Sequence, residues 1–341
     1  MARKTRVNKI TDPATLARVN PDNQRLLDDF MEYLKSTQKS PSTIAVYKND
    51  IEIAWVWGLH HNRDKAFVDW KKRDIMSFQN YLVNENGNSP ARVRRIKATL
   101  SSLSNFIENI LDDEYPNFRN IIHKVESPVL QPVREKTILS DEQLQGLLDH
   151  LTEKGDYEKA CMVALAMCSG RRKSELVLFK VNYFADEHIV SGSLYRTPEK
   201  IKTKGRGNGK YIHCYTLAHQ FKPYFDMWMK YRREHGVESE WLFPSHDDMS
   251  QHLSVSSMNS WAQSISRYLG VSFYWHSLRH YTTTYLAKAG IPDSVIAQLF
   301  SWESVDMVSV YNDTTIDESL DKYFNANGIV AGATKSVADL A

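Results

Sequence analysis

Apolar residues recur at intervals of three and four along most of the chain, which is the spacing of one face of an α-helix. A further run of this kind lies around residues 75–82. Elsewhere an N-cap residue followed by proline at the first helical position marks a helix start. The residues 20–125 therefore read as a small helical bundle. Its start signals are Asn20-Pro21, Ser40-Pro41 and Ser89-Pro90.

The helical pattern stops at residues 126–137, where "ESPVLQPVREKT" carries two prolines and no periodicity. Such a stretch is typical of an extended linker between domains. Ser140 then begins a new helix, because Gln143 follows it at the spacing of a capping box. We expect a second domain from residue 138.

The second domain is predicted to be helical as well, with one exception. Residues 188–217 contain β-prone runs on both sides of a loop rich in Gly and Lys, which predicts a small antiparallel sheet. The expected fold is therefore mainly α with a small antiparallel β-sheet, in two domains. The predicted parts are a flexible basic arm (1–19), a helical domain (20–125), a linker (126–137), a second domain (138–325) and a C-terminal tail (326–341).

Composition fits a protein of this kind. Among the 341 residues, 42% are hydrophobic and 25% charged, as in ordinary soluble globular proteins of two domains. No apolar run approaches the length of a membrane span, and the first residues lack the apolar region of a signal peptide. Three cysteines without paired spacing indicate reduced thiols. We expect a cytoplasmic protein.

Overall charge identifies no partner, because the net charge is only +2. Positive charge is concentrated in the arm "ARKTRVNK" and in "RVRRIK" at residues 92–97. Either stretch taken alone is an ordinary solvated terminus or helix face. Together they favour contacts with a nucleic-acid backbone.

Four stretches of the second domain carry polar residues that packing does not require: "CSGRRKSEL", "KTKGRGNGKY", "WHSLRHYTTTYLAKAG" and "SWESVDMVSVY". Arginines bind phosphate oxygens in pairs, and a lysine on a hairpin can protonate a leaving oxygen. Histidine shuttles protons near neutral pH, and tyrosine is a competent oxygen nucleophile. No nearby cluster of acidic residues is suited to magnesium. The set fits metal-free phosphoryl transfer, although each residue alone is more often structural.

In order and spacing these stretches resemble the tyrosine recombinase, or phage integrase, family. "SGRRKSEL" is similar to the pattern of the family's first arginine with its glutamate companion, Glu175. The chain departs from the usual pattern at Lys173 and Phe300, and Arg171 is interpreted as a solvated neighbour. The catalytic residues that the resemblance implies are Arg172, Lys204, His276, Arg279, Trp302 and the nucleophile Tyr311.

The resemblance also implies a function: site-specific DNA recombination by a C-shaped clamp, without metal or nucleotide cofactor. The implied partners are double-stranded DNA and further copies of the chain, as a homotetramer on two DNA sites. A helical seam from Ile316 to Phe324 would then dock on a neighbouring protomer or pack on its own domain. The expected phosphate contacts are Arg92, Arg94, Arg95, Lys97, Arg134 and Lys136.

Three alternatives to recombination remain open at this point. One is a recombinase-fold DNA-binding regulator, such as a phage repressor, that keeps the catalytic residues unused. Another is a related phosphotyrosine enzyme, either a type IB topoisomerase or a telomere-resolving enzyme. The third is a purely structural helical protein.

Overall fold

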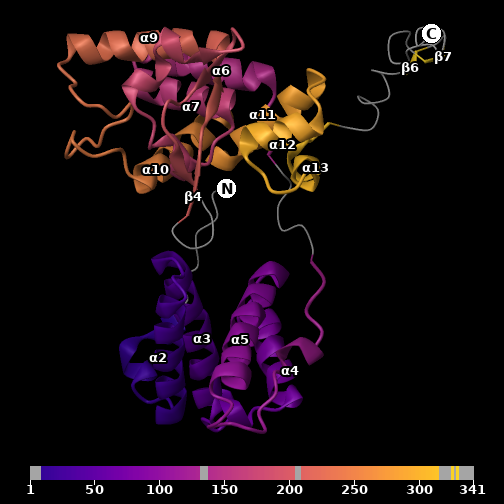
Figure 1. The fold of residues 1–341 in the computed structure, drawn as a ribbon. Coiled ribbons are helices and arrows are strands. Elements are labelled where there is room, and N and C mark those ends of the chain that lie inside the picture. The colour runs from indigo at the N-terminus through magenta and orange to yellow at the C-terminus, as the bar shows by residue number, and fades with distance from the viewer. Residues whose placement is uncertain (1–8, 131–136, 204–208, 315–323, 326–327, 330–341) are drawn as a thin grey trace. The chain divides into compact units, whose positions relative to one another are not determined.

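The computed structural model of the protein describes residues 9–130, 137–203, 209–314, 324–325 and 328–329. These residues fall into two compact units, one before residue 131 and one from residue 137 onward. In Figure 1 the first unit is coloured indigo to magenta, and the second runs from magenta through orange to yellow. Helices dominate both units and the strands are short, so the predicted fold class is confirmed.

The N-terminal unit begins its main helices at the predicted start signals. The side chain of Asn20 accepts a hydrogen bond from the backbone of Asp22, and Ser40 and Ser89 cap their helices in the same way. A π-helical turn, Tyr81–Glu85, follows the fourth helix. The helices are α1 (Pro13–Leu16), α2 (Pro21–Ser36), α3 (Pro41–His61), α4 (Lys72–Asn80) and α5 (Pro90–Ile110).

The C-terminal unit begins at the predicted capping box, where the Ser140 hydroxyl accepts from the Gln143 backbone and the Gln143 side chain accepts in return. Its first helices are α6 (Asp141–Glu153), α7 (Tyr157–Ser169) and α8 (Lys173–Leu176). Those that follow the strands are α9 (Ala218–Glu234), α10 (Val255–Leu269), α11 (Trp275–Lys288), α12 (Asp293–Phe300) and α13 (Asp306–Tyr311).

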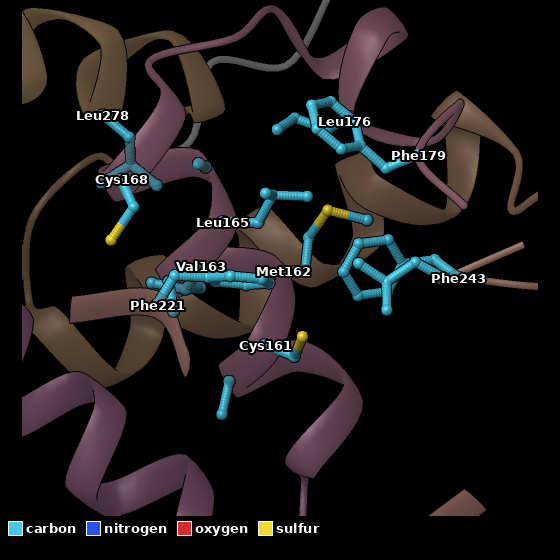
Figure 2. Packing of buried hydrophobic residues seen from close by; sticks show 14 of the residues in the cluster. Cys161, Met162, Val163, Leu165, Cys168, Leu176, Phe179, Phe221, Phe243 and Leu278 are labelled. Carbon is cyan, nitrogen blue, oxygen red and sulfur yellow. The ribbon is translucent and has the colours of Figure 1, made fainter. Parts of the chain in front are cut away.

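Helix α7 lies at the centre of the C-terminal unit and packs against α6, α9 and α11. Its sequence, YEKACMVALAMCS, is apolar on nearly every face, as expected of a buried helix. Figure 2 shows Met162, Val163 and Leu165 of α7 among side chains from neighbouring elements, including Phe221 of α9 and Leu278 of α11. This packing fixes the C-terminal end of α7, where the first candidate site residues follow.

Residues 188–217 form a small antiparallel sheet, as predicted, and a separate two-stranded hairpin. One sheet holds β1 (Ile189–Val190), β2 (Leu194–Arg196) and β5 (Tyr215–Leu217) in that order, all antiparallel. The other is the hairpin of β3 (Ile201–Thr203) and β4 (Lys210–Ile212). Pro198 follows β2 and has no N–H to extend the ladder, which explains the break.

The predicted helical seam near the C-terminus does not reach Phe324. Strand β6 (Phe324–Asn325) pairs with β7 (Gly328–Ile329) as an antiparallel hairpin. The rest of the seam, residues 315–323, lies outside the described residues.

Candidate active site

The turn after α7 places two arginines side by side at the end of a buried helix. Gly170 ends α7 in the left-handed conformation, with φ 57°. Arg172 then caps α8, and its backbone N–H donates to Glu175 Oε2 at 3.1 Å. The Arg172 side chain donates from Nη1 to Glu175 Oε1 at 3.0 Å and to Thr203 Oγ1 at 3.2 Å. The predicted pairing of Arg172 with Glu175 is therefore present in the fold.

Glu175 is fully buried and connects Arg172 to the β3–β4 hairpin. The Thr203 hydroxyl, at the end of β3, donates to Glu175 Oε1. Burial opposes ionisation, but this hydrogen bond and the charges of Arg171 and Arg172 hold the pKa of Glu175 below its ordinary value. A buried carboxylate thus fixes both the arginine and the strand that leads into the next loop.

The loop in which the lysine is predicted lies between β3 and β4. Lys204 is the first residue after β3, but it lies outside the described residues, as does the turn through residue 208. Lys210, on β4, donates from Nζ to the carbonyl of Ser301 at 3.1 Å. The end of the hairpin nearest its turn therefore contacts Ser301, just before Trp302.

Helix α11 presents His276, Arg279 and His280 on one face, because residues three and four apart are neighbours on a helix. The helix is anchored at its start by Trp275, whose Nε1 donates to the Met258 carbonyl at 2.6 Å. Arg279 is fully buried and donates from Nη1 to the carbonyl of Gly170 at 2.8 Å. This bond joins α11 to the turn that carries Arg172.

Three aromatic rings surround the Arg279 guanidinium. Its central carbon lies 4.8 Å from the ring centroid of Phe300, 4.9 Å from that of Trp302 and 5.4 Å from that of Tyr311. These are cation–π distances. Arg279 Nε and Nη2 have no hydrogen-bond acceptor among the residues that the structure describes. The site therefore contains a buried cation whose Nε and Nη2 donors are available to a bound anion.

Tyr311 lies at the end of α13, with its hydroxyl 3.0 Å from His276 Nε2. Its ring stacks on Trp302 at a centroid distance of 5.0 Å and an interplanar angle of 18°. The residue is only 8% exposed. Thr284 of α11 donates to the Tyr311 carbonyl and accepts from the backbone N–H of Asp313. Side chains of α11 thus contact both the hydroxyl and the backbone of the tyrosine.

Partial burial and nearby positive charge favour the neutral form of the His276 imidazole. Burial lowers the pKa of His276 to about 4, and the positive charge of Arg279 acts in the same direction. Burial and the charges of Arg172 and Arg171 likewise lower the pKa of Arg279 to about 10. A neutral imidazole can accept a hydrogen bond from the Tyr311 hydroxyl through Nε2.

Arg171 is not solvated, so that expectation is wrong. Its side chain is 2% exposed, and Nη2 donates to the carbonyl of Leu299 near the end of α12. Its guanidinium carbon lies 5.7 Å from the Phe300 ring centroid. The sequence cannot separate the two adjacent arginines, because which one turns inward depends on where α12 packs.

The basic stretch 92–97 lies on α5 of the N-terminal unit, where two of its arginines share one acid. Arg92 Nη1 contacts Asp50 Oδ1 at 2.5 Å, and Arg95 Nη2 contacts the same oxygen at 3.2 Å. Asp50 is fully buried. Burial raises the pKa of this carboxyl, against the opposing charge of Arg95. Asp50 therefore holds both guanidinium groups, while the Arg95 side chain remains half exposed.

The prediction that Lys97 contacts phosphate is wrong, because its side chain points into the N-terminal unit. It is 5% exposed, and its ammonium donates to Gln79 Oε1 at 2.8 Å and to the Val125 carbonyl at 2.6 Å. Arg94 is exposed and donates from Nε to the Pro128 carbonyl at 2.8 Å. The other two expected contacts, Arg134 and Lys136, lie outside the described residues.

Other features of the described chain add no second kind of site. All three cysteines are buried and unpaired, and burial raises the pKa of Cys168 to about 12. Within the described residues, no group of three or more His, Cys, Asp or Glu side chains is arranged to hold a metal ion. In the same parts of the chain, no helix combines the length and the hydrophobicity needed to cross a membrane.

Comparison with known proteins identifies the family. Residues 137–318 match the model of the phage integrase family, which is more than half of the chain. The chain belongs to the phage integrase family. A second model, the N-terminal SAM-like domain of phage integrases, matches residues 26–117. The two matched regions fall in the two compact units.

Relatives of this phage integrase family member include recombinases. The chain is 27% identical over 229 residues to the SPbeta prophage-derived recombinase-like protein YomM of Bacillus subtilis, covering 66% of each chain, just under two thirds. It is 23% identical over 322 residues to tyrosine recombinase XerC of Caldanaerobacter subterraneus, covering 86% of this chain and 84% of that one.

A solved structure in the family shares the fold. It is a lambda integrase tetramer bound to a Holliday junction, with a TM-score of 0.61 at 18% identity. The match covers 85% of this chain and 77% of the integrase.

The candidate site also contains residues that the sequence pattern does not single out. Thr203 forms hydrogen bonds with Arg172 and Glu175, and Arg171 contacts the Leu299 carbonyl and the Phe300 ring. Neither residue stands out from its neighbours in the sequence. Phe300 was noted only as a departure. The structure gives it a place, because a Cβ at Gly170 would overlap the Phe300 ring. The large residue and the glycine are thus complementary.

Proposed function

We propose that this protein is a site-specific DNA recombinase that cleaves and rejoins DNA through a 3'-phosphotyrosine intermediate. The observation that carries the proposal is the 3.0 Å contact between the Tyr311 hydroxyl and His276 Nε2, beside the buried Arg279 guanidinium. A tyrosine with a neutral base on its hydroxyl and cations around its ring is equipped to become a nucleophile.

In the proposed cleavage, Tyr311 Oη forms a bond to the scissile phosphorus while the bond from phosphorus to the 5' oxygen breaks. The tyrosine proton passes to the neutral His276, and Lys204 gives a proton to the departing 5' oxygen. Arg172 and Arg279 bind the non-bridging phosphate oxygens. Binding an anion here also offsets the positive charges that lower the pKa of His276, so the histidine becomes a stronger base when DNA is bound.

Rejoining is the reverse reaction with a different strand. A free 5'-hydroxyl attacks the phosphotyrosine, the bond from phosphorus to Tyr311 Oη breaks, and the two protons return. The phosphodiester energy is retained in the protein–DNA bond, and the residues of the chain supply each proton transfer. Trp302 stacks beneath Tyr311 and supports the ring through both steps.

DNA is the proposed partner, bound by both units. In the N-terminal unit the exposed Arg94 and the half-exposed Arg95 are the candidates for phosphate contacts among residues 92–97. Strand exchange between two duplexes needs four such sites. The lambda integrase tetramer on a Holliday junction supports a tetramer for this chain as well.

A trapping experiment tests the nucleophile without a known target. Purified protein is mixed with nicked, sheared DNA from its source and denatured in SDS, and fragments that remain attached to protein are sequenced. The wild type and the control Tyr268→Phe should retain fragments, whereas Tyr311→Phe should bind DNA and retain none. An adduct in Tyr311→Phe would show that another residue is the nucleophile.

A second candidate is a DNA-binding regulator with the same fold. The burial of Tyr311 and Arg279 favours it, because a fully buried guanidinium presents no surface to a phosphate in this conformation. In that case, fragments would bind natively to the wild type and all release in SDS. If adducts form, a substrate with two target sites then separates recombination from simple relaxation of DNA.

A further inference from the structure

Arg171 connects the turn after α7 to the far end of α12. The side chain is buried, and its Nη2 donates to the carbonyl of Leu299, one residue before the end of that helix. A cation is favourable at this position, because the last carbonyls of a helix have no partner within it. The contact joins two segments 128 residues apart.

Phe300 lies against the same cation. Its ring centroid is 5.7 Å from the Arg171 guanidinium carbon and 4.8 Å from that of Arg279. Gly170 leaves the space that the ring occupies, since any side chain at that position would overlap it. The end of α12 is therefore held by a hydrogen bond to its backbone and by two cation–π contacts to its last side chain.

The segment held in this way leads directly into the candidate site. Ser301 follows Phe300 in the left-handed conformation, with φ 55°, and turns the chain. Trp302 then stacks on Tyr311, with a second contact to Phe300 at a centroid distance of 4.8 Å. A shift at the end of α12 is thus passed to the tyrosine through one turn and one ring stack.

A buried guanidinium is costly to place, and an apolar side chain would fill the same space without losing hydration. Arg171 offsets part of the cost through Glu175, whose ionised form its charge favours. It has no exposed surface with which to contact DNA. Its contribution must come through the elements that it connects.

We propose that Arg171 is a positioning residue, which fixes the end of α12 and so holds the Trp302–Tyr311 stack against His276. Its effect on DNA cleavage rests on the proposed function. The geometry itself belongs to the free protein and can be measured without DNA.

The test compares Arg171→Met and Arg171→Lys with the matched control Lys173→Met, two residues away on the exposed side of the same turn. The first readout is the imidazole titration of His276 by NMR in free protein, with the signal assigned by its loss in His276→Gln. Arg171→Met should raise the pKa of His276 toward its ordinary value, because displacement of Tyr311 would reduce the burial that lowers it. Lys173→Met should leave it unchanged.

The second readout is single-turnover cleavage of the nicked fragments recovered by trapping. Arg171→Met should lower the rate at saturating DNA by about 10- to 100-fold, since small displacements of reacting groups have effects of this size. The half-saturating DNA concentration should stay within about twofold. Arg171→Lys keeps the charge and a donor, so it should recover part of the rate.

A folded Arg171→Met protein with the His276 titration and cleavage rate of the control would overturn the proposal. If Arg171→Met does not fold, Phe300→Leu removes the ring between the guanidiniums and is read in the same way. If the wild type forms no covalent adduct, the proposed recombinase function fails, while the His276 titration still decides whether Arg171 positions the tyrosine.

Discussion

Each unit contains a buried carboxylate that binds arginine and a threonine hydroxyl, but the pKa values of the two carboxyl groups are shifted in opposite directions. In the N-terminal unit, Asp50 accepts from Arg92, Arg95 and Thr99. In the C-terminal unit, Glu175 accepts from Arg172 and Thr203. Both acids are fully buried. Burial raises the pKa of Asp50, whereas that of Glu175 is lowered despite burial.

The difference comes from the Thr203 hydrogen bond to Glu175 and from how many cations surround each acid. Two arginines that still reach solvent face Asp50, with side chains 23% and 51% exposed. Glu175 instead interacts with Arg171, Arg172 and Arg279, two of which are almost completely buried. One negative charge among three positive charges leaves an excess that suits a phosphate anion. The same local arrangement binds two arginines in one unit and forms part of the proposed phosphate site in the other.

The largest expected effect is on stability, from removing each acid in turn. Glu175→Gln leaves buried guanidiniums without their counter-charge and should lower the free energy of unfolding of its unit by about 3–5 kcal/mol. Asp50→Asn should cost less, about 1–3 kcal/mol, because Arg92 and Arg95 can turn to water. Both losses of stability can be measured by urea titration, with hydrogen exchange in peptides from each unit as the signal. Equal losses in the free energy of unfolding would refute the proposed difference between the surroundings of Asp50 and Glu175.

Acid should affect the two units in opposite directions. The lowered pKa of Glu175 gives stability above its ordinary value of 4.5 that is lost as pH falls through the folded pKa. His276 adds a loss in the same unit between pH 6.5 and about 4, where the unfolded chain binds a proton that the folded one does not. The raised pKa of Asp50 means that its folded form gains protons first, so its contribution to stability grows as pH falls toward 3.8.

Hydrogen exchange between pH 7 and pH 4 measures this contrast. Protection should fall more steeply in the C-terminal unit than in the N-terminal unit. His276→Gln should reduce the steepness above pH 4 and leave the N-terminal unit unchanged. A parallel loss in both units would contradict the opposite shifts of the two acids.

The smallest expected effect separates two cations of the same helix. Arg94→Gln should weaken DNA binding about equally for all sequences and reduce the slope of log affinity against log salt by about 1. Lys97→Met should leave that slope unchanged and instead lower stability, because it removes the ammonium from Gln79 and the Val125 carbonyl. The measurement is DNA affinity at several salt concentrations. A reduced salt slope in Lys97→Met would show instead that Lys97 contacts phosphate.

The sequence by itself determined the elements and the candidate residues. Helix starts at Asn20, Ser40, Ser89 and Ser140 follow from local capping chemistry, which depends on a few adjacent residues. The order of motifs in the second half was enough to indicate the family. Spacing on one helix also predicted that His276 and Arg279 share a face.

Only the tertiary structure decided which of these side chains meet and which are buried. Arg171 and Arg172 are adjacent and chemically identical, yet packing of α12 against the α7 turn buries the first and leaves the second 32% exposed. Lys97 belongs to a basic run but faces inward, because the helix period directs every third or fourth residue to the core. The contact of Tyr311 with His276 joins residues 35 apart. Local sequence fixes which groups are available, whereas burial and long-range contact depend on how whole helices pack.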